Sequence, residues 1–182
     1  MTFFKRFLSS LALSTIAFAM AFTEVAGAAD PIKIGMTVSS QGRFALAAQS
    51  GERGLKIWIN DVNSRGGISI NGQKRKIELV SLDDRSDKAM VPRVYETLIK
   101  EKGVDILFGP FGSTLTGAAA NTTEQFDKFL MIWSASSDAI YEQGYKYVVS
   151  GSQIAASRMS HPSIRALKAV GVKTIACLLY TS

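Results

Sequence analysis

Residues 104–114 read Val104-Asp105-Ile106-Leu107-Phe108-Gly109-Pro110-Phe111-Gly112-Ser113-Thr114, an apolar strand pattern that passes through two glycines and a proline into two hydroxyl residues. A helical pattern follows over residues 115–126. In a parallel α/β sheet, ligands bind where a strand ends and the next helix begins. The free N–H groups and the dipole of such a helix start favour a negative group. This stretch therefore predicts an α/β sheet in which Ser113 and Thr114 donate hydrogen bonds to a small anion.

The rest of the chain alternates between short apolar segments and helical patterns. The expected strands cover residues 32–37, 77–82, 129–133, 145–149 and 172–180, and the expected helices cover 47–63, 87–102 and 155–170. Asn71-Gly72, between residues 68–70 and 77–82, is a type I′ hairpin signal, and Arg65-Gly66-Gly67 is typical of a helix end. Helices between consecutive strands predict a parallel, doubly wound α/β sheet.

Both ends of the chain carry segments that lie outside this pattern. Lys5 and Arg6 precede an apolar run over residues 7–22, and Ala26-Gly27-Ala28 supplies small residues for cleavage. Residues 1–28 are therefore a predicted signal peptide rather than a membrane anchor. Residues 177–182 match one reading frame of a common sequencing adapter. We interpret them as an artefact on a truncated gene, the alternative being a natural buried strand.

The composition limits the chemistry that this chain can perform. The net charge is +6, but the basic residues are scattered apart from Lys74-Arg75-Lys76, so we expect no nucleic-acid partner. The single cysteine, Cys177, excludes a disulfide framework within the chain. Asp83-Asp84 lack a third metal ligand, and we predict that they cap a helix beginning near Ser86. We expect neither a metal nor a cofactor.

Three loops rich in hydroxyl side chains follow predicted strands. They span Ser39–Phe44, Gly109–Thr114 and Ser134–Asp138, and a parallel sheet should bring them to one edge. Each loop alone is also compatible with an ordinary helix cap. The second loop lacks the lysine of a phosphate-binding loop, which argues against a nucleotide site. His161, the only histidine, is predicted to lie far from Ser113, so we expect no Ser-His-Asp catalysis.

With these features in place, the chain resembles the solute-binding proteins of ABC importers for branched-chain amino acids and related amides. Asp61-Val62-Asn63-Ser64-Arg65-Gly66-Gly67-Ile68 matches the family's D-x-N-x-x-G-G-I pattern, and further matches are Ile32-Lys33-Ile34-Gly35, Asp83-Asp84, Gly109-Pro110, Ser113 and the Ser134–Asp138 loop. The resemblance implies a two-lobed, leucine-binding-protein-like type I periplasmic-binding fold. We thus expect a first α/β lobe at residues 29–150, and a hinge with the start of a second lobe at 151–176.

The resemblance also implies which residues bind the ligand. Ser113, beside Thr114, falls where the family holds the α-carboxylate of the ligand. The Ser136 carbonyl falls where the family binds the ligand ammonium. Asp138 falls where well-known members have threonine, so here a carboxylate is expected to face the ammonium.

The loop that closes over the ligand in this family corresponds to residues 41–47, which include the predicted ligand-binding residues Gln41 and Phe44. Some members have an aromatic residue where this chain has Ala47, which implies a wider pocket or a different ligand. Some members also join the loop after the second strand of the sheet to the loop after the third strand by a disulfide. This chain has Ser86 and Gly112 at those positions.

Two functions remain open from the sequence. The first is a monomeric periplasmic binding protein that delivers a small amino-acid-like ligand to the membrane permease of an ABC importer. The second is the ligand-sensing ectodomain of a signalling receptor with the same fold. A secreted hydrolase is disfavoured because no general base accompanies Ser113, so we expect no enzymatic activity.

Overall fold

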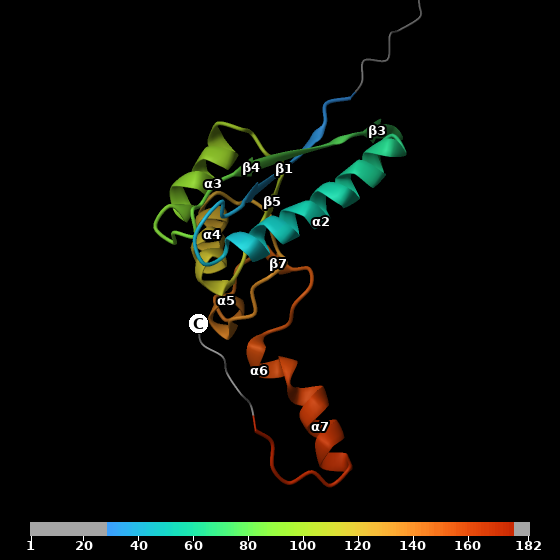
Figure 1. The fold of residues 1–182 in the computed structure, drawn as a ribbon. Coiled ribbons are helices and arrows are strands. Elements are labelled where there is room, and N and C mark those ends of the chain that lie inside the picture. Colours follow the sequence, from blue (N-terminus) through green and yellow to red (C-terminus); the bar gives the residue numbers. More distant parts are fainter. Residues whose placement is uncertain (1–28, 177–182) are drawn as a thin grey trace, which may run out of the picture.

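The computed structural model describes residues 29–176, and its centre is a five-stranded parallel sheet (Figure 1). The strands are β1 (Ile32–Thr37), β4 (Ile77–Leu82), β5 (Ile106–Phe108), β6 (Leu130–Ile132) and β7 (Val148–Ser150). They pair in the order β4-β1-β5-β6-β7, with every neighbouring pair parallel. The predicted α/β fold class with a parallel sheet is therefore confirmed.

The helices are α2 (Ala45–Ser64), α3 (Val91–Lys100), α4 (Ser113–Gln125), α5 (Asp138–Tyr141), α6 (Ala156–Met159) and α7 (His161–Ala169). Helix α2 lies on one face of the sheet, and α3 and α4 lie on the other (Figure 1). Such a covering on two faces is what a parallel sheet requires, because its strands are apolar on both sides.

Alternate residues of the strands belong to apolar clusters on the two faces of the sheet. Leu107 of β5 and Leu130 of β6 pack with Tyr95 of α3 and Leu115 of α4, and all four side chains are fully buried. On the other face, strands β1 and β4 pack against Ile59 and its neighbours on α2. This alternation follows from the two-residue period of a strand. It also decides which face of the sheet each helix covers.

The hairpin at Asn71-Gly72 forms as predicted, but its second strand differs. Both residues have positive φ angles, 51° and 82°, as a type I′ turn requires. The turn joins β2 (Ile68–Ile70) to β3 (Gln73–Arg75), which pair as a separate antiparallel sheet. The segment 77–82, expected as the partner, instead joins the main sheet as β4. The short hairpin strands leave it free to pair in parallel with β1.

Two predicted helices are shorter than expected. Helix α3 begins at Val91 rather than at residue 87, because residues 87–90 form a turn, closed by a bond from the Met90 N–H to the Asp87 carbonyl at 3.2 Å. The helix predicted over residues 155–170 is divided at Ser160 into α6 and α7. Pro162 explains the division, because it has no N–H to continue the hydrogen-bond ladder of α6.

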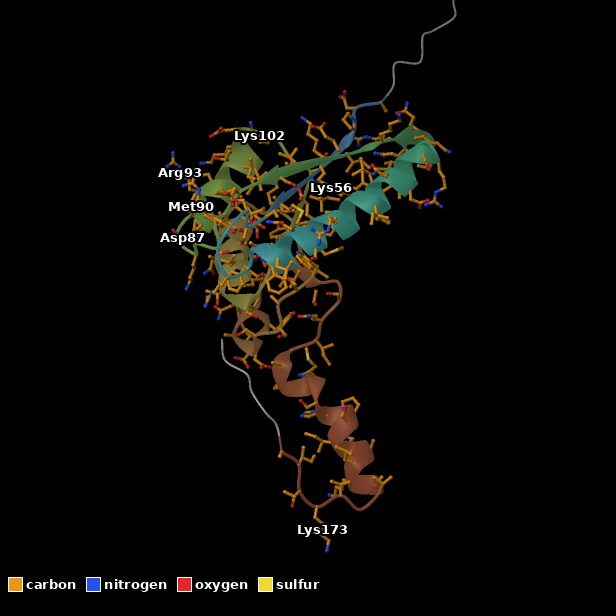
Figure 2. The ribbon with its side chains drawn as sticks, in the orientation of Figure 1. Lys56, Asp87, Met90, Arg93, Lys102 and Lys173 are labelled. Carbon is orange, nitrogen blue, oxygen red and sulfur yellow. The ribbon has the colours of Figure 1, made fainter. Side chains whose placement is uncertain are left out.

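The described chain beyond β7 extends away from the sheet. Helices α6 and α7 project from it, and Lys173 lies past α7 at the far end (Figures 1 and 2). All residues of α7 are exposed. The strand predicted at residues 172–180 does not form over its described part, residues 172–176, and its remainder lies outside the described residues. The predicted signal peptide and the predicted adapter segment also lie outside them.

Candidate functional site

The carboxyl edge of the sheet carries the three hydroxyl-rich loops, and they lie together. The loop after β5 is bonded to the loop after β6, since Gly112 donates its N–H to the Ser134 hydroxyl oxygen at 3.1 Å. The loop after β1 reaches the loop after β5 through Phe44 and Phe111, whose ring centroids are 5.9 Å apart. The predicted convergence of the three loops is confirmed.

Ser113 is the first residue of α4, and the neighbouring loop orients its hydroxyl. The Ser113 Oγ accepts hydrogen bonds from the backbone N–H groups of Ser136 and Ser137, at 3.2 and 3.1 Å. Because the oxygen accepts from two donors, its O–H proton is left to bond a third group. Gly112 is the N-cap of α4, and no side chain in residues 29–176 makes a cap hydrogen bond there, so the alternative in which Ser113 is only a helix cap is wrong. The first N–H groups of α4 and its dipole add to the attraction for an anion.

Ser136 and Asp138 face the segment that leads into α6. The Ser136 carbonyl accepts a hydrogen bond from Ala156 N–H at 2.6 Å. The Asp138 carboxylate accepts from the N–H of Ser157 at 3.1 Å and from its hydroxyl. The bond from the Ser157 hydroxyl is the main reason that the pKa of Asp138 is lowered. Both predicted ammonium partners are therefore already bonded to residues 156 and 157.

A surface depression of about 970 Å³ begins at Ser113 and Thr114. It runs along α4, between the segment that precedes α3 and helix α5, and Ser137 also lines it. Asp87, on the rim formed by that segment, is labelled in Figure 2. The structure thus brings Ser113 and Thr114 together on one hollow surface. The other predicted residues do not line it, namely Gln41, Phe44, Ser136 and Asp138.

Gln41 and Phe44 belong to the loop after β1, where their backbone groups are held by Ser86. The Ser86 hydroxyl donates to the Gln41 carbonyl at 2.8 Å and accepts from the Phe44 N–H at 3.2 Å. The Arg43 guanidinium lies 4.4 Å from the centroid of the Phe44 ring, a cation–π contact. Gln41 is exposed and Phe44 is partly buried, so Gln41 is the more accessible of the two.

A row of three aromatic rings crosses the same edge of the sheet, and we did not predict it from the sequence. Phe111 lies between Phe44 and Trp133, with its ring centroid 5.8 Å from that of Trp133. The Trp133 indole N–H donates to the Gly109 carbonyl at 2.7 Å, which fixes its plane. The sequence did contain a signal for this row. Phe44 and Phe111 lie within two of the hydroxyl-rich loops, and Trp133 directly precedes the third.

The two aspartates after β4 do not cap a helix, which corrects the prediction made for them. Helix α3 begins at Val91 and has no side-chain cap. Asp84 is fully buried and accepts hydrogen bonds from Thr37 and Ser39, while Asp83 accepts from Ser40. The prediction failed because these partners lie more than 40 residues away in the chain.

Within residues 29–176, no three His, Cys, Asp or Glu residues lie close enough to hold a metal ion. His161 is exposed at the start of α7, and the Ser113 hydroxyl is bonded to backbone N–H groups instead. No helix in the described part of the chain has the length and hydropathy to cross a membrane.

Comparison with known proteins shows which family the chain belongs to. A curated relative, "Leu/Ile/Val-binding protein homolog 8" of Brucella suis biovar 1 (strain 1330), is 28% identical over 138 residues, which are 76% of this chain and 31% of the relative. The homologue from Brucella abortus (strain 2308) is 26% identical over 135 residues, which are 74% of this chain and 32% of that protein. This chain therefore spans about a third of the length of the curated relatives that it matches.

Solved structures lead to the same family. The branched-chain amino acid transporter substrate-binding protein LivJ of Streptococcus pneumoniae, in complex with isoleucine, is 28% identical with a TM-score of 0.60, over 66% of this chain and 33% of that one. A solute-binding protein of Rhodopseudomonas palustris BisB5, with 3,4-dihydroxybenzoic acid, shares the fold at 22% identity and a TM-score of 0.65, over 79% and 37%. These relatives are substrate-binding proteins, not enzymes. Residues 31–182 match the family described as "Periplasmic binding protein", and the chain belongs to that family.

Proposed function

We propose that this chain forms the first lobe of a two-lobed protein that captures a small carboxylate-bearing solute and delivers it to the permease of an ABC importer. The observation that supports this most is the Ser113 hydroxyl, held at the start of α4 by the N–H groups of Ser136 and Ser137. An oriented hydroxyl beside the positive end of a helix dipole binds a carboxylate with little loss of conformational freedom.

The named relatives support a carboxylate as the shared feature of the ligand. Isoleucine and 3,4-dihydroxybenzoic acid, the ligands of the two structures described above, both carry one. We propose an amino-acid-like ligand, in which the ammonium approaches the Ser136 carbonyl and Asp138. Each of these groups has further lone pairs beyond its bond to Ala156 or Ser157. We also propose that Thr114 contacts the ligand from α4, and that Gln41 and Phe44, which lie outside the depression, reach it from the loop after β1.

Location and partners follow from the same proposal. Removal of residues 1–28 would release the protein into the periplasm, where a monomer meets the permease subunits in the membrane. The relatives named above are components of transporters or homologues of Leu/Ile/Val-binding proteins. This favours transport over the alternative of a receptor ectodomain with the same fold.

Calorimetric titration of the two-lobed protein tests this proposal. The probes are L-leucine, L-isoleucine, benzoate and 3,4-dihydroxybenzoate, each at neutral pH. L-Leucinamide, which lacks the carboxylate, is the matched control for L-leucine. We expect at least one carboxylate to bind, and L-leucinamide to bind more weakly than L-leucine if that carboxylate is leucine. Failure of all four acids to bind would contradict the proposed ligand class.

A further inference from the structure

Asp84 is a buried carboxylate that the proposed ligand contacts do not use. Its side chain is fully buried at the end of β4. It accepts hydrogen bonds from Thr37 Oγ1 at 2.6 Å, from Ser39 Oγ at 2.5 Å and from the Ser86 N–H at 2.9 Å. A buried carboxylate is tolerated when hydrogen bonds replace its lost hydration. These three donors therefore have to stay in place for Asp84 to remain buried.

The donors come from the two segments that Asp84 joins. Thr37 ends β1, and Ser39 begins the loop that continues to Phe44, while Ser86 lies in the segment 83–86 after β4. The carboxylate thus links the start of the first binding loop, defined here as residues 39–44, to the neighbouring strand end. Within residues 29–176, no lysine or arginine forms a salt bridge with Asp84, and the donors that bond it are neutral.

Further bonds continue this link along the first binding loop. Ser40 donates to Asp83 from its N–H at 2.9 Å and from its hydroxyl at 2.5 Å. Ser86 bonds the backbone of Gln41 and Phe44, as described above. Gly42 has a φ of 83°, and a Cβ built there would lie 2.8 Å from the Ser86 Cβ. The backbone of the loop therefore lies directly against the segment that Asp84 orders.

From this network we propose that Asp84 is a positioning residue for ligand binding. It fixes Ser39 and Ser86, and through them the conformation in which Gln41 and Phe44 meet the ligand. This inference rests on the proposed function, because it assumes that the first binding loop contacts the solute. If the loop is ordered for only part of the time, the apparent affinity falls to that same fraction of its intrinsic value. A loop held in place before binding also loses less entropy on binding.

The test compares Asp84→Ala and Asp84→Asn with a control variant at the opposite, amino-terminal end of strand β4. Asn63 also joins two segments, since its Nδ2 donates to the Ile77 carbonyl and its Oδ1 accepts from the Ile77 N–H, both at 2.8 Å. Asn63→Ala therefore removes a comparable pair of bonds without touching the first binding loop. Amide hydrogen exchange of Ser40, Phe44 and Ile77 is measured in the two-lobed protein, beside titrations with L-isoleucine and with benzoate.

We expect Asp84→Ala to speed exchange of the Ser40 and Phe44 amides and to weaken binding about tenfold, as for a loop ordered a tenth of the time. Asp84→Asn, which keeps one acceptor, should give a smaller change in the same direction. Asn63→Ala should speed exchange at Ile77 and leave the affinity unchanged. If Asp84→Ala does not fold, Asp84→Asn and Thr37→Val, which removes one donor, decide the question.

Two results would overturn the inference. The first is unchanged exchange of the Ser40 and Phe44 amides in every folded variant of the network. The second is faster exchange there with wild-type affinity, which would make Asp84 a purely structural residue. If the wild-type protein binds none of the four acids named under the proposed function, the proposed ligand class fails, yet the exchange data still decide whether Asp84 orders the loop. If binding of Ser113→Ala is weakened while that of Asp84→Ala is not, the function stands and the positioning role does not.

Discussion

Replacing Ser113 by alanine removes the oriented hydroxyl that we assign to the ligand carboxylate. The helix dipole and the N–H groups at the start of α4 remain in this variant. A charge-assisted hydrogen bond is worth about 1.5–3 kcal/mol. Because about 1.4 kcal/mol corresponds to a factor of ten in affinity, binding should weaken by about tenfold to a hundredfold.

The structure adds a second effect of the same substitution. The N–H groups of Ser136 and Ser137 lose their acceptor, the Ser113 Oγ, and both residues are partly buried. Stability of the ligand-free protein should therefore also fall, by about 1 kcal/mol or somewhat more. A change in melting temperature alone cannot distinguish a ligand contact from a tie between loops.

Ser134 supplies the matched control for this ambiguity. Its hydroxyl ties the same two loops, accepting from Gly112 N–H at 3.1 Å and donating to the Pro110 carbonyl at 3.3 Å. Calorimetric titration of Ser113→Ala and Ser134→Ala with L-isoleucine and with benzoate, beside melting curves without ligand, separates the two effects. We expect similar losses of stability but a much larger loss of affinity for Ser113→Ala. Equal losses of affinity in the two variants would refute a direct contact between Ser113 and the carboxylate.

Three further predictions concern acid stability, backbone strain and processing. Burial raises the pKa of Asp83, but hydrogen bonds from Ser40 and Arg85 outweigh it and the pKa is lowered. The stabilisation from Asp83 should thus be complete above its unfolded pKa of about 4 and be lost as the pH falls through its lower folded value. The gap in unfolding free energy between wild type and Asp83→Asn should therefore shrink in acid, and a gap independent of pH would count against this. Gly67→Ala should destabilise the protein by about 1 kcal/mol or more without changing its affinity for the ligand. The reason is that φ of Gly67 is 98° and the new Cβ would lie 2.0 Å from the Arg75 carbonyl oxygen. Equal melting temperatures of the variant and the wild type would disprove this prediction. Mass spectrometry of the exported protein should find a first residue within one or two positions of Ala29, and retention of residues 1–28 would contradict a cleaved signal peptide.

The local sequence determined most of the elements of this protein, with ends that lie within a few residues of those in the structure. Apolar segments with helical patterns between them predicted the strands of the parallel sheet. Asn71-Gly72 predicted a hairpin, and Arg65-Gly66-Gly67 predicted the end of α2, because each depends on backbone angles that only a few residue types adopt. The convergence of the hydroxyl-rich loops followed from parallel strands alone. These features were predictable because the interactions that set them act within a few residues.

The tertiary structure alone decided how the loops are joined. Asp84 bonds Thr37 and Ser39, which are 47 and 45 residues away, because the sheet order places β4 beside β1. Ser113 meets Ser136 and Ser137 because β5 lies beside β6. A sequence shows that hydroxyls and carboxylates follow the strands, but not which of them pair. That choice depends on strand order and register, which arise from packing of the whole lobe rather than from any local preference.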